Sequence, residues 1–381
     1  MTRVAIVVTH LLGTGHLARA LVLARAFSDA GNKTLVLSGG VPVPHFDTSG
    51  ITFEQLPPLR SDGVNFTQLL TAEGTEADSS YKAARCAKLR QSVHDFAPDV
   101  MITELFPFGR RVLRTEFTDL LEMAATMAPR PKIFCSIRDI LAPPSKPAKA
   151  DATHALVAEH YDGVLVHADP DITTLEDSWP VTPALASRLH YTGYVANPPA
   201  SDHPAQLGKG EVLVSAGGGN VGAALYAVAL EAAAQDASRC WRILVGGTDA
   251  RERAAALCAT APANVIAEPA RADFRQMLRH AAASVSMCGY NTALDLLQAG
   301  TPAVLVPFDA GAEVEQSLRA RALARRDGFE FLAAADITSD SLRRAVDRVI
   351  AAPKRGGDQV QMAGAQRSVE IVMAWGKGSQ P

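Results

Sequence analysis

The sequence predicts an α/β protein made of two doubly wound parallel-sheet domains. Short apolar runs rich in β-branched residues alternate with helical patterns, which is typical of parallel strands joined by helices. The alternation begins in the same way twice, because residues 4–8 and 211–215 are each followed by a Gly-rich turn and a helix. A chain of 381 residues also exceeds the usual size of a single hydrophobic core.

The first lobe opens with a predicted strand at residues 4–8, a Gly-rich turn at 10–16 and an amphipathic helix. Gly31 ends this helix and a strand follows at 33–37, so these segments form a βαβ unit with parallel strands. Polar residues follow each later strand, where open α/β sheets bind their ligands. These later strands are expected at 99–102, 132–137 and 163–166.

A segment rich in Pro and small polar residues, at 195–204, predicts a linker. The second lobe begins near residue 210 and repeats the plan of the first. Its predicted strands include 211–215, 241–245 and 303–306. We therefore expect an N-terminal domain over 1–200, a C-terminal domain over 210–365 and a helical segment over 366–381. Two such lobes are expected to leave a cleft at their strand ends.

Composition and charge argue against several classes of protein. Lys and Arg total 37 against 40 Asp and Glu, and the net charge of −3 provides no basic field for nucleic acid. The apolar run at 4–8 is too short for a signal peptide or a membrane span. The cysteines lack CxxC spacing, which disfavours a disulfide framework or a zinc site and favours small buried residues in a reducing cytoplasm. They are Cys86, Cys135, Cys240, Cys258 and Cys288.

The first Gly-rich turn contains Gly13, Gly15 and His16. It lacks the third Gly of a dinucleotide fingerprint and the GK[ST] of a phosphate-binding Walker loop. What remains is a helix N-terminus with exposed amides and a neighbouring imidazole, which can hold an anion and move a proton. The alternative is a structural or solvated loop histidine.

The equivalent turn of the second lobe contains Gly217, Gly218, Gly219 and Asn220. Glycines allow backbone amides to approach a diphosphate closely. The alternative is that these glycines serve only a tight connection.

The segment 286–307 reads as a buried strand, a Gly turn at Gly289, a helix and a second buried strand. Asn291 and Thr292 stand at the predicted helix start, and Asp295 lies one turn later on the face of Asn291. The helix start can face phosphate, and the acid can accept hydrogen bonds from a ribose diol. The alternative is an N-cap with a solvated Asp.

The run 286–307 and the following 308–316 resemble the C-terminal domain of family 28 glycosyltransferases. Residues 13–21 resemble the first loop of that family, and more closely that of the UDP-sugar hydrolase of pseudaminic acid synthesis. Other stretches resemble a bacterial group of predicted glycosyltransferases. These stretches are 56–60, 103–111 and 135–141.

The resemblance implies a GT-B fold, with two Rossmann-like domains that face a cleft. The acceptor side is N-terminal, the nucleotide-sugar side is C-terminal, and the final helix packs back on the N-terminal domain. No metal or cofactor is implied, because the nucleotide sugar is a substrate.

Several site roles are implied by position within this resemblance. Asp295 matches the acid that holds the ribose, and Gln316 matches a glutamine that holds the donor sugar, with Glu315 beside it. The turn at 217–220 faces the diphosphate, and His16 is a base or an acceptor-phosphate contact. The sequence departs from the family pattern at three places. Asp stands for the usual Glu at 295, Glu315-Gln316 stands for paired glutamines, and the first loop has one fewer Gly.

Charges at the ends of buried strands add acceptor-side candidates. Glu104 ends one predicted strand, and Arg138 with Asp139 ends another. The alternative is an internal pair between Arg138 and a carboxylate. In the second lobe, Phe274 is a candidate for contact with the nucleobase, with core packing as the alternative.

The expected function is transfer of a sugar from a nucleotide-diphosphate sugar, such as a UDP-sugar, to an acceptor hydroxyl with inversion. His16 or Glu104 would remove the hydroxyl proton. The alternatives are a nucleotide-sugar hydrolase and a catalytically silent subunit that binds a sugar nucleotide. The expected partners are the donor and a small-molecule or lipid-linked acceptor, in the cytoplasm. Residues 106–108 with Arg110 and Arg111 are a candidate for peripheral contact with the inner membrane face.

Overall fold

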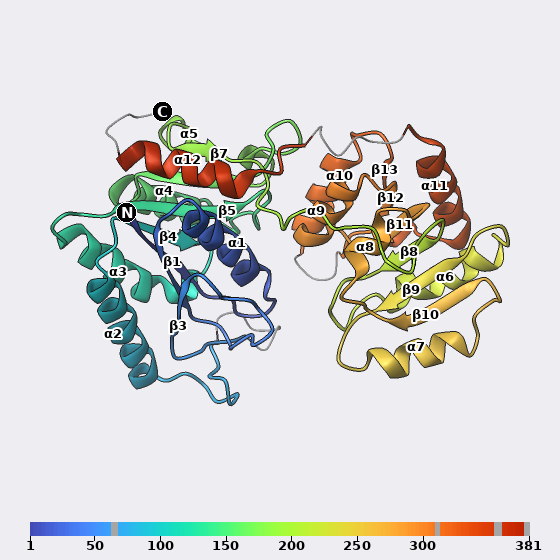
Figure 1. The fold of residues 1–381 in the computed structure, drawn as a ribbon, viewed down its shortest axis with the longest axis horizontal. Coiled ribbons are helices and arrows are strands. Elements are labelled where there is room, and N and C mark those ends of the chain that lie inside the picture. Colours follow the sequence, from blue (N-terminus) through green and yellow to red (C-terminus); the bar gives the residue numbers. More distant parts are fainter. Residues whose placement is uncertain (62–67, 309–312, 354–359, 377–381) are drawn as a thin grey trace. The chain divides into compact units, whose positions relative to one another are not determined.

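The computed structural model describes residues 1–61, 68–308, 313–353 and 360–376. The chain forms two compact units (Figure 1). Unit 1 comprises Met1–Asn197 and Gln361–Pro381, and unit 2 comprises Pro198–Val360. The predicted linker at 195–204 is therefore divided between the two units, and residues 377–381 lie outside the described residues.

Unit 1 contains a parallel sheet with the strand order β3-β2-β1-β4-β5-β6-β7. Every neighbouring pair of strands in it is parallel, as the predicted βαβ connections require. The strands are β1 (Arg3–Val8), β2 (Lys33–Ser38), β3 (Thr52–Gln55), β4 (Val100–Glu104), β5 (Lys132–Arg138), β6 (Gly163–His167) and β7 (Leu189–Tyr191).

Helices cover both faces of this sheet (Figure 1). On β1, Val4, Ile6 and Val8 pack in the cluster that includes α1 and α12, whereas Val7 packs in the cluster that includes α2, α3 and α4. Such burial on both faces explains why the strand reads as a continuous apolar run. The helices are α1 (Gly15–Asp29), α2 (Ser79–Phe96), α3 (Arg114–Thr126), α4 (Pro147–His160), α5 (Pro183–Ala186) and the C-terminal α12 (Gly364–Gly376).

Unit 2 contains a second parallel sheet with the strand order β10-β9-β8-β11-β12-β13. The strands are β8 (Val212–Ser215), β9 (Trp241–Val245), β10 (Val265–Pro269), β11 (Ala283–Ser286), β12 (Ala303–Leu305) and β13 (Phe329–Phe331). The helices are α6 (Ala223–Ala234), α7 (Ala250–Cys258), α8 (Phe274–Leu278), α9 (Tyr290–Ala299), α10 (Glu315–Leu323) and α11 (Ser339–Ala351).

The strand order reverses direction at the first strand of each unit. β1 lies between β2 and β4, and β8 lies between β9 and β11. At such a reversal the loops after the two central strands diverge to opposite faces of the sheet and leave room for a ligand. The two parallel sheets confirm the predicted fold class.

The cysteines agree only in part with the expectation of small buried residues. All five are free, and Cys135 and Cys288 are buried. The expectation is wrong for Cys258, which is exposed because it ends α7, a helix in which Ala254 is the buried residue.

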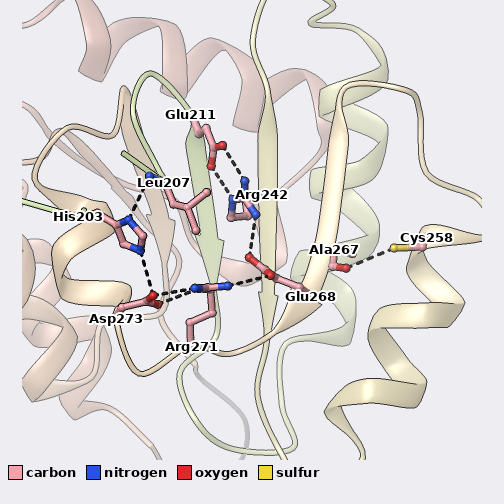
Figure 2. A network of polar contacts seen from close by, with 9 residues as sticks. All are labelled: His203, Leu207, Glu211, Arg242, Cys258, Ala267, Glu268, Arg271 and Asp273. Atoms are coloured by element: carbon pink, nitrogen blue, oxygen red, sulfur yellow. Dashed lines mark hydrogen bonds and ion pairs between the residues drawn. The ribbon is translucent and has the colours of Figure 1, made fainter. Parts of the chain in front are cut away.

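The segment that enters unit 2 is held by polar contacts (Figure 2). The Nδ1 atom of His203 accepts the backbone N–H of Ala205 at 3.1 Å. Its Nε2 atom therefore carries the proton and donates to Asp273 at 3.0 Å. Asp273 also accepts two hydrogen bonds from the Arg271 guanidinium, from Nε to Oδ1 at 2.8 Å and from Nη2 to Oδ2 at 2.7 Å. These hydrogen bonds hold the pKa of the Asp273 carboxyl well below its usual range.

Arg242 on β9 joins Glu211, the residue before β8, to Glu268 on β10 (Figure 2). It donates to Glu211 at 2.6 and 2.8 Å and to Glu268 at 2.8 Å. Its side chain is only 7% exposed, so the guanidinium depends on these partners for its charge compensation.

Replacing Arg242 with Ala should lower the free energy of unfolding of unit 2 by about 3 kcal/mol, because the partly buried Glu211 loses its counterion and Glu268 keeps only Arg271. Equilibrium urea denaturation measures this change. The control is Arg348→Ala, since Arg348 pairs with Glu330 but is 58% exposed, and it should cost less than about 1 kcal/mol. Equal losses in the two variants would contradict the assignment.

Candidate active site

His16 and Glu104 meet at the strand-order reversal of unit 1. His16 follows β1 in the first turn of α1, and Glu104 ends β4, the next strand of the sheet. Because both strands end at the same edge, the two side chains come together, with Nδ1 of His16 at 3.0 Å from Oε1 of Glu104. The structure thus unites two residues that lie 88 positions apart in the sequence.

Arg19 supplies the counterion for Glu104. It lies one turn after His16 on α1 and donates to the same carboxylate oxygen, Oε1. Glu104 is 2% exposed, and this burial alone would raise the pKa of its carboxyl. The Arg19 charge and the hydrogen bond from His16 outweigh burial, so the pKa of Glu104 lies well below its usual range. Glu104 is therefore an anion beneath His16.

His16 is neutral in the folded protein. Burial lowers its pKa to about 3, against the opposing effect of the hydrogen bond to Glu104. Nδ1 of His16 lies 3.0 Å from the Glu104 carboxylate, which only accepts hydrogen bonds, and 3.3 Å from Nη2 of Arg19, which only donates. We assign the imidazole proton to Nδ1 on the shorter contact, which leaves a lone pair on Nε2. Nε2 has no hydrogen-bond partner among the residues that the structure describes, and the side chain is 16% exposed. A neutral imidazole held in this way can accept a proton.

Arg110 also acts on His16, and its position was not predicted by the sequence patterns. It follows the strand β4 by a short loop, has a left-handed backbone (φ 57°), and donates to the Thr9 carbonyl at 2.7 Å. Its charge contributes to the lowered pKa of His16. A clustering of Arg near the end of β4 was visible in the sequence, but its contact with the β1 loop depends on the fold.

The other predicted acceptor-side residues surround these strand ends. Gly13 is exposed in the loop before α1, and Gly15 is the first residue of that helix. Arg138 ends β5, and Asp139 follows it, 1% exposed, with its Oδ1 accepting the N–H of Ile140 at 2.7 Å.

A cavity of about 360 Å³ lies beside the first loop of unit 1. Thr14, which precedes α1, lines it together with His10 and residues of the loop after β2. The apolar part of its lining includes Leu11, Val41 and Val43. Its size is within the range of small-molecule pockets.

In unit 2, the Gly-rich turn joins β8 to α6. Gly218, Gly219 and Asn220 are exposed, and a Cβ placed on Gly218 would meet nothing within 4 Å. Gly217 has φ +81°, a conformation that L side chains rarely adopt. The turn therefore exposes backbone to solvent without side chains above it, as a phosphate cradle requires.

A second turn, after β9, supports this one. The N–H of Gly247 donates to the Gly218 carbonyl at 3.1 Å, and the N–H of Thr248 donates to Oδ1 of Asn220 at 2.9 Å. A Cβ on Gly246 would lie 2.1 Å from the Gly217 carbonyl oxygen, so only Gly fits at this contact. The side chain of the predicted Asn220 thus holds the Gly-rich turn against the turn after β9.

The start of α9 lies beside this turn. Its N-cap, Gly289, provides no side-chain hydrogen bond, so the first-turn N–H groups, including those of Asn291 and Thr292, have no such cap. The N–H of Met287 donates to the Ser215 carbonyl at 3.1 Å, which ties the ends of β11 and β8 together. The positive end of α9 is therefore next to the Gly-rich turn.

Arg319 on α10 supports the turn before α9, and the sequence patterns did not identify it. It is 2% exposed, and its guanidinium donates to the Cys288 carbonyl at 3.1 Å.

Asp295 is held by an arginine in the described structure. Nε of Arg275 donates to its Oδ1 at 2.8 Å, and the same guanidinium donates to Gln298 and to the Pro198 carbonyl. Burial raises the pKa of Asp295 despite this ion pair. Its side chain remains 20% exposed. Arg275 was not predicted, because no spacing rule links α8 to α9.

The remaining predicted donor-side residues are dispersed around the same sheet edge. Phe274 begins α8 and is half-buried. Gln316 in the first turn of α10 accepts the Phe308 N–H at 3.1 Å through its Oε1, and the N–H of Glu315 donates to Glu313 at 2.8 Å. Residues 309–312, part of the segment 308–316, lie outside the described residues.

Two further findings concern the described ranges only. Among these residues, no group of three or more His, Cys, Asp or Glu could hold a metal ion. No helix in them is long and apolar enough to span a membrane.

Residues 213–372 match the model of the glycosyltransferase family 28 C-terminal domain. Similar solved structures include CalG4, the calicheamicin glycosyltransferase, with a TM-score of 0.66, 15% identity and coverage of 100% of both chains. MurG of Acinetobacter baumannii has a TM-score of 0.63 and 17% identity over 98% of this chain and 99% of its own. No curated protein matches the sequence.

VinC, a glycosyltransferase solved in complex with DTDP, has a TM-score of 0.64 and 17% identity over 99% of this chain and 100% of its own. These similarities extend over both units. They confirm the predicted GT-B fold, and the family-model match confirms the predicted resemblance of the C-terminal domain to that of family 28.

The neutral histidines predict a loss of stability in acid. Burial lowers the pKa of both His16 and His167 to about 3, from 6.5. Between these values the unfolded chain binds more protons than the folded chain, so stability falls as the pH falls from 6.5 toward 3. Each histidine changes the free energy of unfolding by up to about 1.4 kcal/mol per pH unit in this range.

His167→Gln should therefore lose less stability than the unaltered protein when urea denaturation at pH 7 is compared with pH 5. The control is His94→Gln, because His94 is 70% exposed, and it should follow the unaltered protein. If His167→Gln lost the same free energy on acidification, His167 would not be neutral in the folded state.

Proposed function

We propose that this chain, whose residues 213–372 match a family 28 glycosyltransferase C-terminal domain, transfers a sugar from a nucleotide-diphosphate sugar to an acceptor hydroxyl. The observation that carries the proposal is the neutral His16 held by the buried Glu104 anion at the strand-order reversal of unit 1. The donor would bind at the equivalent reversal of strand order in unit 2, between β9 and β11.

The donor is assigned to unit 2. Its diphosphate would lie over the exposed Gly218–Gly219 backbone and the uncapped start of α9, where amides and the helix dipole stabilise negative charge. The same groups would stabilise the departing nucleotide diphosphate, without a metal ion. Asp295 would accept the ribose hydroxyls, with Arg275 keeping its carboxylate in place, and Gln316 would contact the sugar.

The acceptor is assigned to unit 1. Its hydroxyl would donate to Nε2 of His16, which removes the proton as the oxygen attacks the anomeric carbon with inversion. Glu104 orients the imidazole through Nδ1 and stabilises the imidazolium that forms. Because Glu104 is buried and ionised beside Arg19, we assign the base to His16 and the orienting role to Glu104. The cavity beside Thr14 would hold the body of the acceptor.

Hydrolysis is the principal alternative, since residues 13–21 also resemble the loop of a UDP-sugar hydrolase. A thermal-shift screen of UDP-, GDP-, TDP- and CDP-sugars identifies the donor, because a ligand that binds the folded state raises the midpoint. Incubation of the bound donor with and without cell extract then separates the reactions. A transferase makes a glycoside only with extract, a hydrolase releases free sugar without it, and a silent subunit makes neither product.

Gly218→Ala should weaken donor binding by about tenfold or more, because the methyl group occupies the space above the amides. The fold should tolerate it, since the added Cβ meets nothing within 4 Å. Calorimetry with the identified donor measures the effect. Gly13→Ala, at an equally open position in unit 1, is the matched control and should leave donor affinity unchanged. If Gly218→Ala bound the donor with unaltered affinity, the diphosphate would not bind at this turn.

His16→Ala should reduce the rate of transfer by about 10² to 10⁴ while donor affinity stays within about twofold. Steady-state kinetics and donor titration check both quantities, with exposed His94→Ala as the control. Since the pKa of His16 is about 3, its protonation should cost no rate above about pH 4. A variant with full turnover would exclude His16 as the base.

A further inference from the structure

We propose that Ser136, His167 and Thr192 form a one-directional hydrogen-bond chain that positions the Glu104 carboxylate, and through it the tautomer of His16. This inference rests on the proposed function, in which His16 is the base. The three residues are positioning residues, because none of them touches His16 itself in the described contacts.

The chain runs across the ends of neighbouring strands. Ser136 on β5 contacts Oε2 of Glu104 at 2.6 Å, and its Oγ lies 2.9 Å from Nε2 of His167 on β6. Nδ1 of His167 lies 2.8 Å from Oγ1 of Thr192, just after β7. Ser136 and His167 are fully buried, and Thr192 is 3% exposed.

The direction of each hydrogen bond follows from the number of protons available. Ionised Glu104 can only accept, so the single hydroxyl proton of Ser136 points to Oε2. His167 must then donate to Ser136 from Nε2. In a neutral imidazole this leaves a lone pair on Nδ1, which accepts from Thr192.

Thr192 has competing acceptors in the Gly193 carbonyl, at 2.7 Å, and the Val166 carbonyl, at 3.3 Å. If its hydroxyl proton turned there, its oxygen lone pairs would face the lone pair of Nδ1 in neutral His167. Burial lowers the pKa of His167 to about 3, in agreement with the neutral form. The arrangement with every group satisfied therefore runs from Thr192 through His167 and Ser136 to Glu104.

The two carboxylate oxygens of Glu104 have separate tasks. Oε2 is held by Ser136, which fixes the rotation of the carboxylate, and Oε1 faces His16 and Arg19. Only with Oε1 in this place does Glu104 accept a hydrogen bond from Nδ1–H of His16 and leave Nε2 free for the acceptor hydroxyl. A satisfied buried network of this kind restricts its members to one arrangement.

A purely structural role for the chain makes a different prediction. Replacing a hydrogen-bonded buried polar group costs stability wherever it lies. A positioning role also changes the tautomer of His16 and the turnover number. The experiment therefore measures both in folded variants of the full chain.

Ser136→Ala and His167→Leu break the chain. His167→Gln retains an N–H donor where Nε2 stands and is the conservative variant. The matched control is Ser38→Ala, because Ser38 ends β2 of the same sheet, is fully buried, and has no hydrogen bond on its Oγ in the described structure.

We expect kcat of Ser136→Ala and His167→Leu to fall about tenfold with an unchanged KM for the donor, as misorientation of a catalytic group does. His167→Gln should retain at least half of the turnover, and Ser38→Ala should be unaltered. Nitrogen NMR of His16 should show one tautomer, protonated at Nδ1, in the unaltered chain, and a mixture in the two broken variants. Thr192→Val, of similar shape, provides the same test if either variant does not fold.

A single Nδ1 tautomer in Ser136→Ala, with kcat within twofold of Ser38→Ala, would overturn the proposal. The NMR measurement does not need turnover. If no sugar nucleotide supports transfer while the tautomer still depends on Ser136, the proposed function fails and the positioning chain stands.

Discussion

The reversal of strand order at the centre of each parallel sheet is the constraint on which both sites depend. Parallel strands end at one edge, and only where their connections turn to opposite faces does that edge remain open. In unit 1 the open edge brings together His16 and Glu104, which follow β1 and β4. In unit 2 it brings the Gly-rich turn after β8 beside the start of α9. One architecture thus positions the proposed proton-accepting site in one unit and the proposed diphosphate site in the other.

The chemistry of unit 1 depends on a charge that is costly to bury. Glu104 stays ionised because Arg19 and His16 donate to Oε1 and Ser136 donates to Oε2, and each lost donor weakens the compensation of the buried charge. In return, the anion fixes the proton of a neutral imidazole on the inner nitrogen. Burial lowers the pKa of His16, and the hydrogen bond to Glu104 sets the orientation of its imidazole.

Local patterns predicted the central strands, the two Gly-rich turns and the helix start at Gly289, because each is determined by residues near one another in sequence. They did not identify the edge strands β3, β7, β10 and β13. The residue resemblance then supplied the GT-B expectation. The contacts that organise the sites are of another kind. The pairs His16–Glu104 and Arg275–Asp295 join different elements, and Ser136 and His167 look like ordinary polar residues within apolar strands. The register between neighbouring strands determines which of these residues meet, and no spacing within one segment of the sequence predicts that register.

Arg275 connects Asp295, the residue proposed to bind the ribose, to Pro198, the first residue of unit 2. Its guanidinium holds Asp295 and the carbonyl of Pro198 at once. A nucleotide whose hydroxyls drew Asp295 toward them would compete with this guanidinium for the carboxylate, and so alter the hydrogen bond from Arg275 to the Pro198 carbonyl. By thermodynamic reciprocity, any strain on that backbone would be felt as a change in nucleotide affinity. The polypeptide connection itself would then report occupancy of the nucleotide site.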